Sequence, residues 1–277
     1  MVETICAEIS RFVAKCPENH FPDSGDPYFA EPLVGFAAAG DPLFTEYKRI
    51  IGPFHQTPGE ILASAATVVC WVLPVTRATR MSNRQESQWP SREWTLTRHH
   101  GENFNSTLRR HLAAWLEGHG HRAVAPQLAP EWRQLDDPAV GIASSWSERH
   151  AAYAAGLGTF SLNDGLITAQ GIAHRLGSVI TNLQLPPTPR TAPDHRNNCL
   201  YYREGSCGAC IGRCPVGAIS WHGHDKTRCR TYVYGAVPDE VGERYGVTNT
   251  GCGLCQTRVP CEMTVPPGNT PPQPRGE

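Results

Sequence analysis

Apolar runs alternate with helical patterns over much of the chain, ahead of a cysteine-rich end. Residues 66–74 (ATVVCWVLP) form a mostly apolar, β-branched run that predicts a buried strand, and residues 166–168 and 176–185 predict two more. Between positions 103 and 118, apolar residues recur at helical spacing and Gly118 marks the end of the helix. The pattern therefore predicts an α/β, or α+β, domain.

Capping signals mark two further helices. Thr57 precedes Pro58 and predicts the start of a short helix. Ser145 and Glu148 have the spacing of a capping box, which predicts a helix that runs past Tyr153 and stops at the turn 156–158. This glycine-containing turn either caps the helix or lets the backbone approach a flat ligand.

Composition and charge narrow the functional class. The chain has 277 residues, a net charge of -1 and a pI near 6.9, which gives no general basic field for nucleic-acid binding. No apolar run approaches the roughly 18 residues of a membrane span, and the first residues have no secretory signal. We expect a cytoplasmic protein without a membrane partner.

Proline-rich segments suggest how the chain is divided. Residues 186–193 contain four prolines and read as a linker. We therefore expect an α/β domain at 1–185, a cysteine-rich domain at 186–265 and a disordered tail at 266–277.

Eight of the eleven cysteines lie between positions 199 and 261. One run has the form C-x2-C-x3-C-P and a second run begins with another C-x2-C, which is the pattern of a protein with two 4Fe-4S clusters. In this pattern the last cysteine of each run crosses to the other cluster. The predicted ligand groups are Cys199, Cys207, Cys210 and Cys261 for one cluster, and Cys214, Cys229, Cys252 and Cys255 for the other.

Two features depart from the usual cluster pattern. Glu204 stands where the first cysteine of the first run is expected, and Cys261 lies six residues after Cys255 instead of four. A zinc ribbon built on the two C-x2-C pairs is the alternative, but one zinc ion leaves four cysteines without a role. Disulfides do not fit a reducing compartment.

Three segments resemble the epoxyqueuosine reductase family: 148–158 (ERHAAYAAGLG), 164–168 (DGLIT) and 176–179 (LGSV). Cys229, in the sequence RCRTY, resembles the isolated cluster ligand of that family. The resemblance implies a nitroreductase-like α/β domain that holds cobalamin, followed by a ferredoxin-like domain with two 4Fe-4S clusters. Reductive dehalogenases are distant relatives with the same plan.

The resemblance also implies site residues. The family has an aspartate, its proton donor, where this chain has Ile142, so Glu148 and Tyr153 are the candidate catalytic residues. Flavin is the alternative to cobalamin, as in other nitroreductase-like domains. The expected cofactor-binding residues are Gly156, Gly158, Leu166, Ile167, Gly177 and Ser178.

The resulting hypothesis is a cobalamin-dependent iron–sulfur oxidoreductase that removes oxygen or cleaves a carbon–halogen bond. We expect a small-molecule substrate or a modified nucleoside; a large RNA is doubtful, because the chain stops sixteen residues after Cys261. Basic residues exceed acidic ones between 186 and 230, which suits a ferredoxin or flavodoxin as electron donor. We expect a monomer. The alternative is an iron–sulfur electron-transfer or corrinoid-activating protein without its own substrate.

Overall fold

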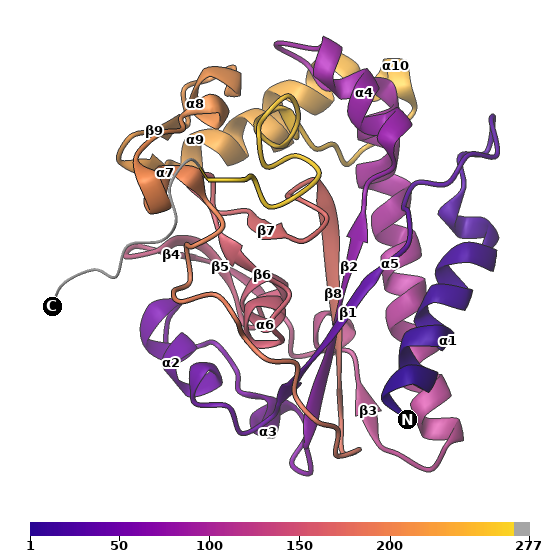
Figure 1. Cartoon of the computed structure of the whole chain (residues 1–277). Coiled ribbons are helices and arrows are strands. Elements are labelled where there is room, and N and C mark those ends of the chain that lie inside the picture. Colours follow the sequence, from indigo (N-terminus) through magenta and orange to yellow (C-terminus); the bar gives the residue numbers. More distant parts are fainter. Residues whose placement is uncertain (269–277) are drawn as a thin grey trace, which may run out of the picture.

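A computed structural model describes residues 1–268 (Figure 1). Most of the predicted disordered tail therefore lies outside the described residues. The strands are β1 (Leu33–Ala38), β2 (Thr67–Pro74), β3 (Ala123–Val124), β4 (Gln134–Asp137), β5 (Gly141–Ser144), β6 (Gly158–Phe160), β7 (Leu166–Thr168), β8 (His174–Thr181), β9 (Ile219–Ser220) and β10 (Gly223–His224). The α-helices are α1 (Val2–Lys15), α2 (Pro42–Ile50), α3 (Pro58–Ile61), α4 (Arg77–Gln85), α5 (Arg92–Gly118), α6 (Glu148–Ala154), α7 (Leu200–Glu204), α8 (Ala209–Arg213), α9 (Lys226–Thr231) and α10 (Glu243–Tyr245).

Short 3-10 and π-helical turns complete the secondary structure. Two π-helical turns follow α9 directly, so that one continuous helical segment runs from α9 to α10. The 3-10 turns are Pro17–Asn19, Pro126–Leu128 and Leu254–Gln256, and the π turns are Tyr232–Ala236 and Pro238–Gly242.

The central sheet has the strand order β1-β2-β8-β3, with every neighbouring pair antiparallel. Strand β2 lies between β1 and β8 and is buried along its whole length. A strand that is covered on both faces has no solvent side, which explains why its sequence is apolar throughout instead of alternating. The predicted mixed α/β fold is confirmed in this part of the chain.

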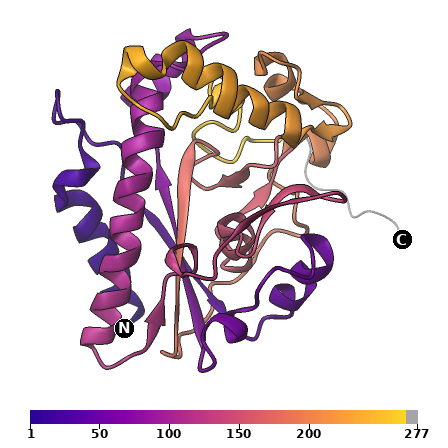
Figure 2. The ribbon, with the colours of Figure 1, turned by 180° about the vertical axis from the view of Figure 1, so that it is seen from behind.

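Helices cover both faces of the sheet (Figures 1 and 2). Val69, Trp71 and Leu73 of β2 point to the face packed by α1 and α5. Val68 and Val72 point to the opposite face, which is packed by α2, α3 and α6. The alternation of side chains along β2 thus supplies two hydrophobic cores with one strand.

Several predicted elements occur with small shifts of their ends. The helix at Thr57 is α3, where Thr57 and Glu60 form a complete capping box. The strand expected at 176–185 is β8, which begins and ends earlier. Helix α5 starts at Arg92, eleven residues before the predicted start.

The predicted capping box at Ser145 is wrong. Helix α6 begins after Ser147, and neither serine caps it with its side chain. Ser145 instead accepts a hydrogen bond on Oγ from the backbone N–H of Arg133, 3.0 Å away. Ser145 therefore stabilises the backbone just before β4 and does not cap α6.

The cysteine-rich segment lies across one end of the sheet, beside α4 (Figure 1). Arg213 on α8 donates to the backbone carbonyls of Asn83 and Glu86 at the end of α4. Residues 186–198, which include the proline-rich run, have no regular secondary structure, but Thr188 exchanges hydrogen bonds with Phe36 of β1. The division into domains at residue 186 stays a prediction.

Candidate functional site

Two adjoining cavities lie between the sheet and the cysteine-rich segment. The first, of about 510 Å³, is lined by Trp94, Trp146 and Glu148 and by four cysteines. The second, of about 680 Å³, is lined by aromatic residues that include Tyr47, Tyr153 and Phe160. Trp132, Ser144, Ser147 and Arg149 line both cavities.

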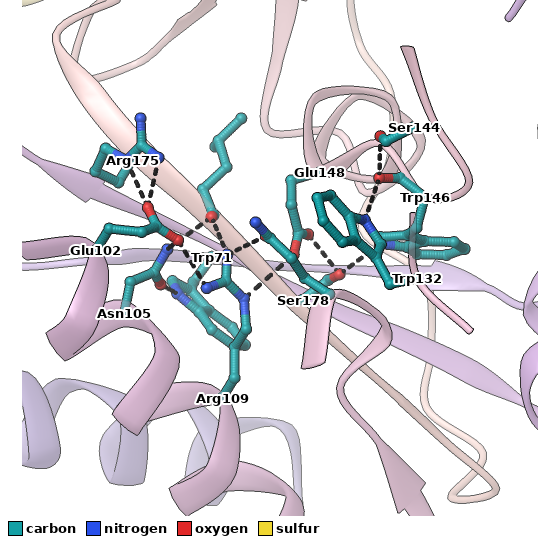
Figure 3. Close-up of polar contacts among 12 residues, drawn as sticks. Trp71, Glu102, Asn105, Arg109, Trp132, Ser144, Trp146, Glu148, Arg175 and Ser178 are labelled. Carbon is teal, nitrogen blue, oxygen red and sulfur yellow. Dashed lines mark hydrogen bonds and ion pairs between the residues drawn. The ribbon is translucent and has the colours of Figure 1, made fainter. Parts of the chain in front are cut away.

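A buried polar network forms one wall of the first cavity (Figure 3). Its centre is Arg109 of α5, whose side chain is 1% exposed. Arg109 donates to Glu102 at 2.9 Å, to Gln127 at 2.7 Å and to the carbonyl of Leu176 at 2.9 Å, and its Nε lies 3.3 Å from Glu148. Each charge in this network therefore has partners, as buried charges require.

Glu148 is held from both sides at the start of α6. Ser178 Oγ donates to Glu148 Oε2 over 2.6 Å, and Trp146 Nε1 donates to Ser178 Oγ over 3.0 Å. Burial raises the pKa of Glu148 above its ordinary value, against the opposing effects of Arg109 and Ser178. A carboxyl group with a raised pKa in a cavity wall can hold a proton for transfer.

The two candidate catalytic residues line different cavities. Glu148 lines the first and Tyr153 lines the second. Ile142, at the position of the expected aspartate, also lines the second cavity. Glu148 and Tyr153 therefore stay separate candidates.

Most of the expected cofactor-binding residues lie in close packing. A Cβ atom at Gly156 or Gly158 would lie 2.8 Å from the Pro189 carbonyl oxygen or 2.4 Å from that of Ile167, respectively, and one at Gly177 would lie 2.4 Å from the Trp71 ring. Packing thus accounts for the three glycines without a ligand. Ile167 is buried among the apolar residues beside Cys199, Ser178 holds Glu148, and Leu166 lines the first cavity. Their cofactor contacts stay a prediction.

The eight cysteines gather in two groups. Cys199, Cys207, Cys210 and Cys261 line one small cavity together. Cys214, Cys229, Cys252 and Cys255 all line the first of the two large cavities. Segments far apart in the sequence thus contribute to each group, and the residues that gather are those of the two predicted ligand groups.

Burial opposes the ionisation of one thiol in each group. It is the main cause that raises the pKa of Cys261 to about 12, and the charges of Cys199, Cys210 and Cys207 add to it. Burial likewise raises the pKa of Cys252 to about 12, with contributions from Cys229 and Cys214. Four thiolates gathered in one place would need positive charge among them, which iron would supply.

Across residues 1–268, no group of three or more His, Cys, Asp or Glu side chains is arranged to hold a metal ion. The arrangement of the cysteines in this part of the chain therefore does not fit a single zinc ion, which needs its ligands around one centre. A 4Fe-4S cube instead takes its four thiolates on an extended cluster. The donor set, four cysteines in each group, fits such a cube.

His224 adjoins the second cysteine group. Its Nδ1 lies 3.1 Å from Asp164 Oδ2, and His224 and Cys229 both line the first cavity. Burial alone would lower the pKa of His224, but the side chains of Asp164 and Cys229 outweigh it and raise this pKa to about 9.

Sequence reasoning missed Glu102, Arg109, Arg175 and the pair Asp164–His224. One local signal existed for Arg109: it shares a helical face with Asn105, Leu112 and Leu116, where the other positions are buried. A charged residue on a buried stripe indicates a partner inside the protein.

Comparison with known proteins finds epoxyqueuosine reductases among the curated relatives. The chain is 25% identical over 268 residues to an epoxyqueuosine reductase of Burkholderia pseudomallei, a match that covers 85% of this chain and 61% of that protein. It is 34% identical over 119 residues to an epoxyqueuosine reductase of Bacillus anthracis, covering 41% of this chain and 29% of that protein. The matches thus span less than two thirds of the length of these curated relatives. No family model matches the chain.

Solved structures share the fold. A crystal structure of an epoxyqueuosine reductase covers 95% of this chain and 66% of its own, with a TM-score of 0.52 and 21% identity. A catabolic reductive dehalogenase in complex with 3-bromo-4-hydroxybenzoic acid covers 96% of this chain and 37% of its own, with a TM-score of 0.52 and 15% identity. No helix among the described residues is both long enough and apolar enough to span a membrane.

One expectation is corrected by these comparisons. The sequence led us to expect a small-molecule substrate and to doubt a large RNA. That prediction is wrong: an epoxyqueuosine reductase of the same fold, which covers 95% of this chain at a TM-score of 0.50 and 21% identity, was solved with an epoxyqueuosine-modified tRNA stem loop. The curated matches and the shared fold confirm the resemblance of this chain to the epoxyqueuosine reductases.

Proposed function

We propose that this protein is an oxidoreductase of the epoxyqueuosine reductase type, which reduces a modified nucleoside in tRNA. The two cysteine groups would hold 4Fe-4S clusters, which supply single electrons when bound, and the residues of the first cavity would hold cobalamin. The observation that carries the proposal is that one cavity is lined both by the second cysteine group and by Glu148. Electrons and a proton would thus reach the same cavity.

The cysteines would hold the clusters in a fixed order. The group Cys214, Cys229, Cys252 and Cys255 lines the first cavity, whereas the group that contains Cys199 lines a separate small cavity. The second group would therefore hold the cluster nearest the cofactor. The first group would hold the cluster that lies nearer the electron donor, since electrons pass from the donor to the site of chemistry.

The lining of the first cavity suits a ligand that carries both apolar surface and polar groups. Trp94, Trp132 and Trp146 supply aromatic surface. Thr97 Oγ1 and His174 Nδ1 are buried in its wall without a hydrogen-bond partner within the protein. A buried polar atom normally has a partner, and the amide groups of a corrinoid would supply one. When bound, cobalamin supplies a strongly reducing cobalt for bond cleavage.

The residues of the chain would manage protons and water. Removing an epoxide oxygen as water takes two electrons and two protons. Glu148 would hold one of these protons at its carboxyl group, where burial favours the protonated form. Arg109 and Ser178 would fix the position of this carboxyl group, which avoids reorganisation during the reaction.

Anaerobic purification and reconstitution test the proposal. Iron, sulfide and cobalt are counted per chain, and the protein is then incubated with a reductant and an epoxyqueuosine-modified tRNA stem loop. The expected results are about eight irons, binding of cobalamin, and loss of the epoxide oxygen seen by mass spectrometry of the digested RNA. Protein without iron, or fully loaded protein that leaves the nucleoside intact, would refute the proposal.

A further inference from the structure

The second cavity has no part in the reaction proposed above. Its volume of about 680 Å³ exceeds that of the first cavity, about 510 Å³. Arg149 and Trp132 are among the residues that line both, so the two spaces adjoin. A substrate that reacts in the first cavity can therefore extend into the second.

A cluster of aromatic side chains lines the second cavity. Phe160 of β6 packs against Tyr153 and His150 of α6, with ring centroids 5.8 Å and 4.9 Å away. Tyr47 of α2 meets His150 edge-on at 4.8 Å. Proteins that bind single-stranded RNA stack its bases on aromatic side chains. This cluster therefore suits a base or another planar ring.

Positive charge is concentrated in the same cavity. Among the described residues that line it, Asp164 is the only one with a carboxylate, and this carboxylate lies 3.1 Å from His224 Nδ1. The net charge of the whole chain is -1, so the excess of positive charge in the cavity is local. It favours an anionic ligand. The basic lining residues with Lys or Arg side chains are Arg49, Arg149, Arg196 and Lys226.

Two of these cations are anchored to neutral groups. Arg149 Nη1 donates to the Asp164 carbonyl at 2.6 Å, and Lys226 Nζ donates to the Val140 carbonyl at 3.0 Å. A guanidinium has five N–H donors and an ammonium has three, so both side chains keep donors for a further ligand. Anchoring on the backbone also reduces the entropy that they would lose on binding it.

We propose that the second cavity binds a nucleotide of the substrate RNA that adjoins the modified nucleoside. Its base would stack on the aromatic cluster, and its phosphate would accept hydrogen bonds from Arg149 and Lys226. The inference rests on the proposed function, because the modified nucleoside itself would react beside Glu148 in the first cavity. Phosphate contacts position a nucleic acid without reading its sequence, and stacking tolerates every base. The cavity would therefore position the RNA and accept any base there.

Binding of an epoxyqueuosine-modified tRNA stem loop to the reconstituted holoprotein tests this inference. Fluorescence anisotropy at several salt concentrations gives the affinity and its salt dependence. Lys226→Gln removes one phosphate contact, so the affinity should fall and the slope of log affinity against log salt should become shallower by about 0.7. Phe160→Leu keeps an apolar side chain but removes the ring, and should weaken binding by about tenfold with an unchanged slope.

The matched control is Arg228→Gln. Arg228 lies on the same helix as Lys226 and its side chain is 59% exposed, but it is not among the described residues that line either large cavity. This variant should keep the wild-type affinity and slope. If Lys226→Gln loses iron, because α9 also carries Cys229, Phe160→Leu decides the question, since Phe160 lies outside the cysteine-rich segment.

The outcomes separate this inference from the proposed function. Wild-type holoprotein that neither binds nor reduces the stem loop would refute the proposed function itself. Wild type that reduces the nucleoside, with Lys226→Gln and Phe160→Leu binding RNA as tightly as Arg228→Gln, would overturn the inference alone. Cobalamin also contains a nucleotide, so its binding is measured separately by absorption without RNA. Weaker cobalamin binding by these two variants would overturn the inference as well and would assign the cavity to the nucleotide of the cofactor.

Discussion

Arg109 holds the candidate site together at the level of single residues. Its guanidinium group is almost completely buried and contacts two carboxylates from different helices, Glu102 of α5 and Glu148 of α6. In a third contact, Arg109 donates to the carbonyl of Leu176 in β8. The residue thus connects α5, α6 and the sheet at one point.

Replacing Arg109 should be costly. Arg109→Met leaves the Glu102 and Glu148 carboxylates buried with less positive charge, and we expect the free energy of unfolding to fall by about 3–5 kcal/mol. Urea unfolding under anaerobic conditions measures the loss. The matched control is Arg110→Met: Arg110 is exposed, and its replacement should cost less than about 0.5 kcal/mol. Equal losses in the two variants would contradict the role of the network.

The activities of two variants can show whether Glu148 or Tyr153 is the proton donor. If Glu148 holds the transferred proton, Glu148→Gln should lower the single-turnover rate on the modified stem loop by about 10²–10⁴-fold. Iron content and cobalamin binding should be retained, because the glutamine oxygen can still accept from Arg109 and its amide nitrogen can donate to Ser178 Oγ. Tyr153 lines the second cavity, so Tyr153→Phe should lower this rate much less. The opposite order of effects would move the proton donor to the second cavity.

His55 makes stability depend on pH. The side chain is buried, the backbone N–H of Ser147 donates to its Nε2 over 3.3 Å, and burial lowers its pKa to about 4. The unfolded chain takes up a proton near pH 6.5 but the folded protein does not, so stability falls as the pH drops from about 6.5 to 4.

The slope from this one residue is at most about 1.4 kcal/mol per pH unit. His55→Gln removes the titrating group and should make the difference in unfolding free energy between pH 7 and pH 5 smaller than in the wild type. Urea midpoints at the two pH values give the comparison. An unchanged difference would mean that the folded protein accepts the proton at His55.

At the scale of elements, the sequence predicts what depends on local patterns. Strand β2 follows from its continuous apolar run, and α3 follows from Thr57 and Pro58. The first half of α5 was missed, since positions 98–102 (RHHGE) are polar or glycine and interrupt the apolar stripe. Glu102 in this stretch pairs with Arg175 of β8 at 2.5 Å, a partner that no local pattern reveals. Because these positions carry polar residues that pair inside the protein, the apolar periodicity that would predict this part of the helix is absent.

Helix α4 is attached to the cysteine-rich segment through Glu262. This carboxylate is 2% exposed and pairs with Arg84 at 2.7 Å and Arg80 at 3.3 Å, both on α4. Glu262→Gln leaves the two arginines without a counter-charge, and we expect it to cost about 3 kcal/mol and to lower iron retention, because Glu262 adjoins Cys261.

A second ion pair provides the control. Asp136 of β4 and Arg230 of α9 also connect distant segments, at 2.9 Å, but their side chains are 72% and 41% exposed. Asp136→Asn should therefore cost less than about 1 kcal/mol. Chemical unfolding and iron analysis of both variants provide the comparison. If the exposed pair proved the more important, solvent exposure would be the wrong criterion here.

At the scale of the whole molecule, the cysteine pattern contained more information than any other part of the sequence. The spacing predicted two groups of four before their places in the fold were known, because the cysteines of 4Fe-4S proteins follow chemical rules of spacing. The structure brings the same cysteines together, and their role as cluster ligands stays a prediction. The cavity beside them could not be predicted. It is built from α5, the start of α6, β8 and α9, whose side chains meet only after the sheet has formed.

The position of the two cysteine groups predicts an unequal response to cobalamin. Only the group with Cys229 lines the first cavity, so a corrinoid bound there should alter the paramagnetic resonance signal of that cluster and leave the other signal unchanged. Cys199→Ala should remove the unresponsive signal and Cys229→Ala the responsive one, each with a loss of about four irons. Titrating reduced wild type and both variants with cobalamin measures the effect. Equal responses from both clusters, or none in protein that binds the corrinoid, would mean that the cofactor lies elsewhere, since only one cysteine group lines the first cavity.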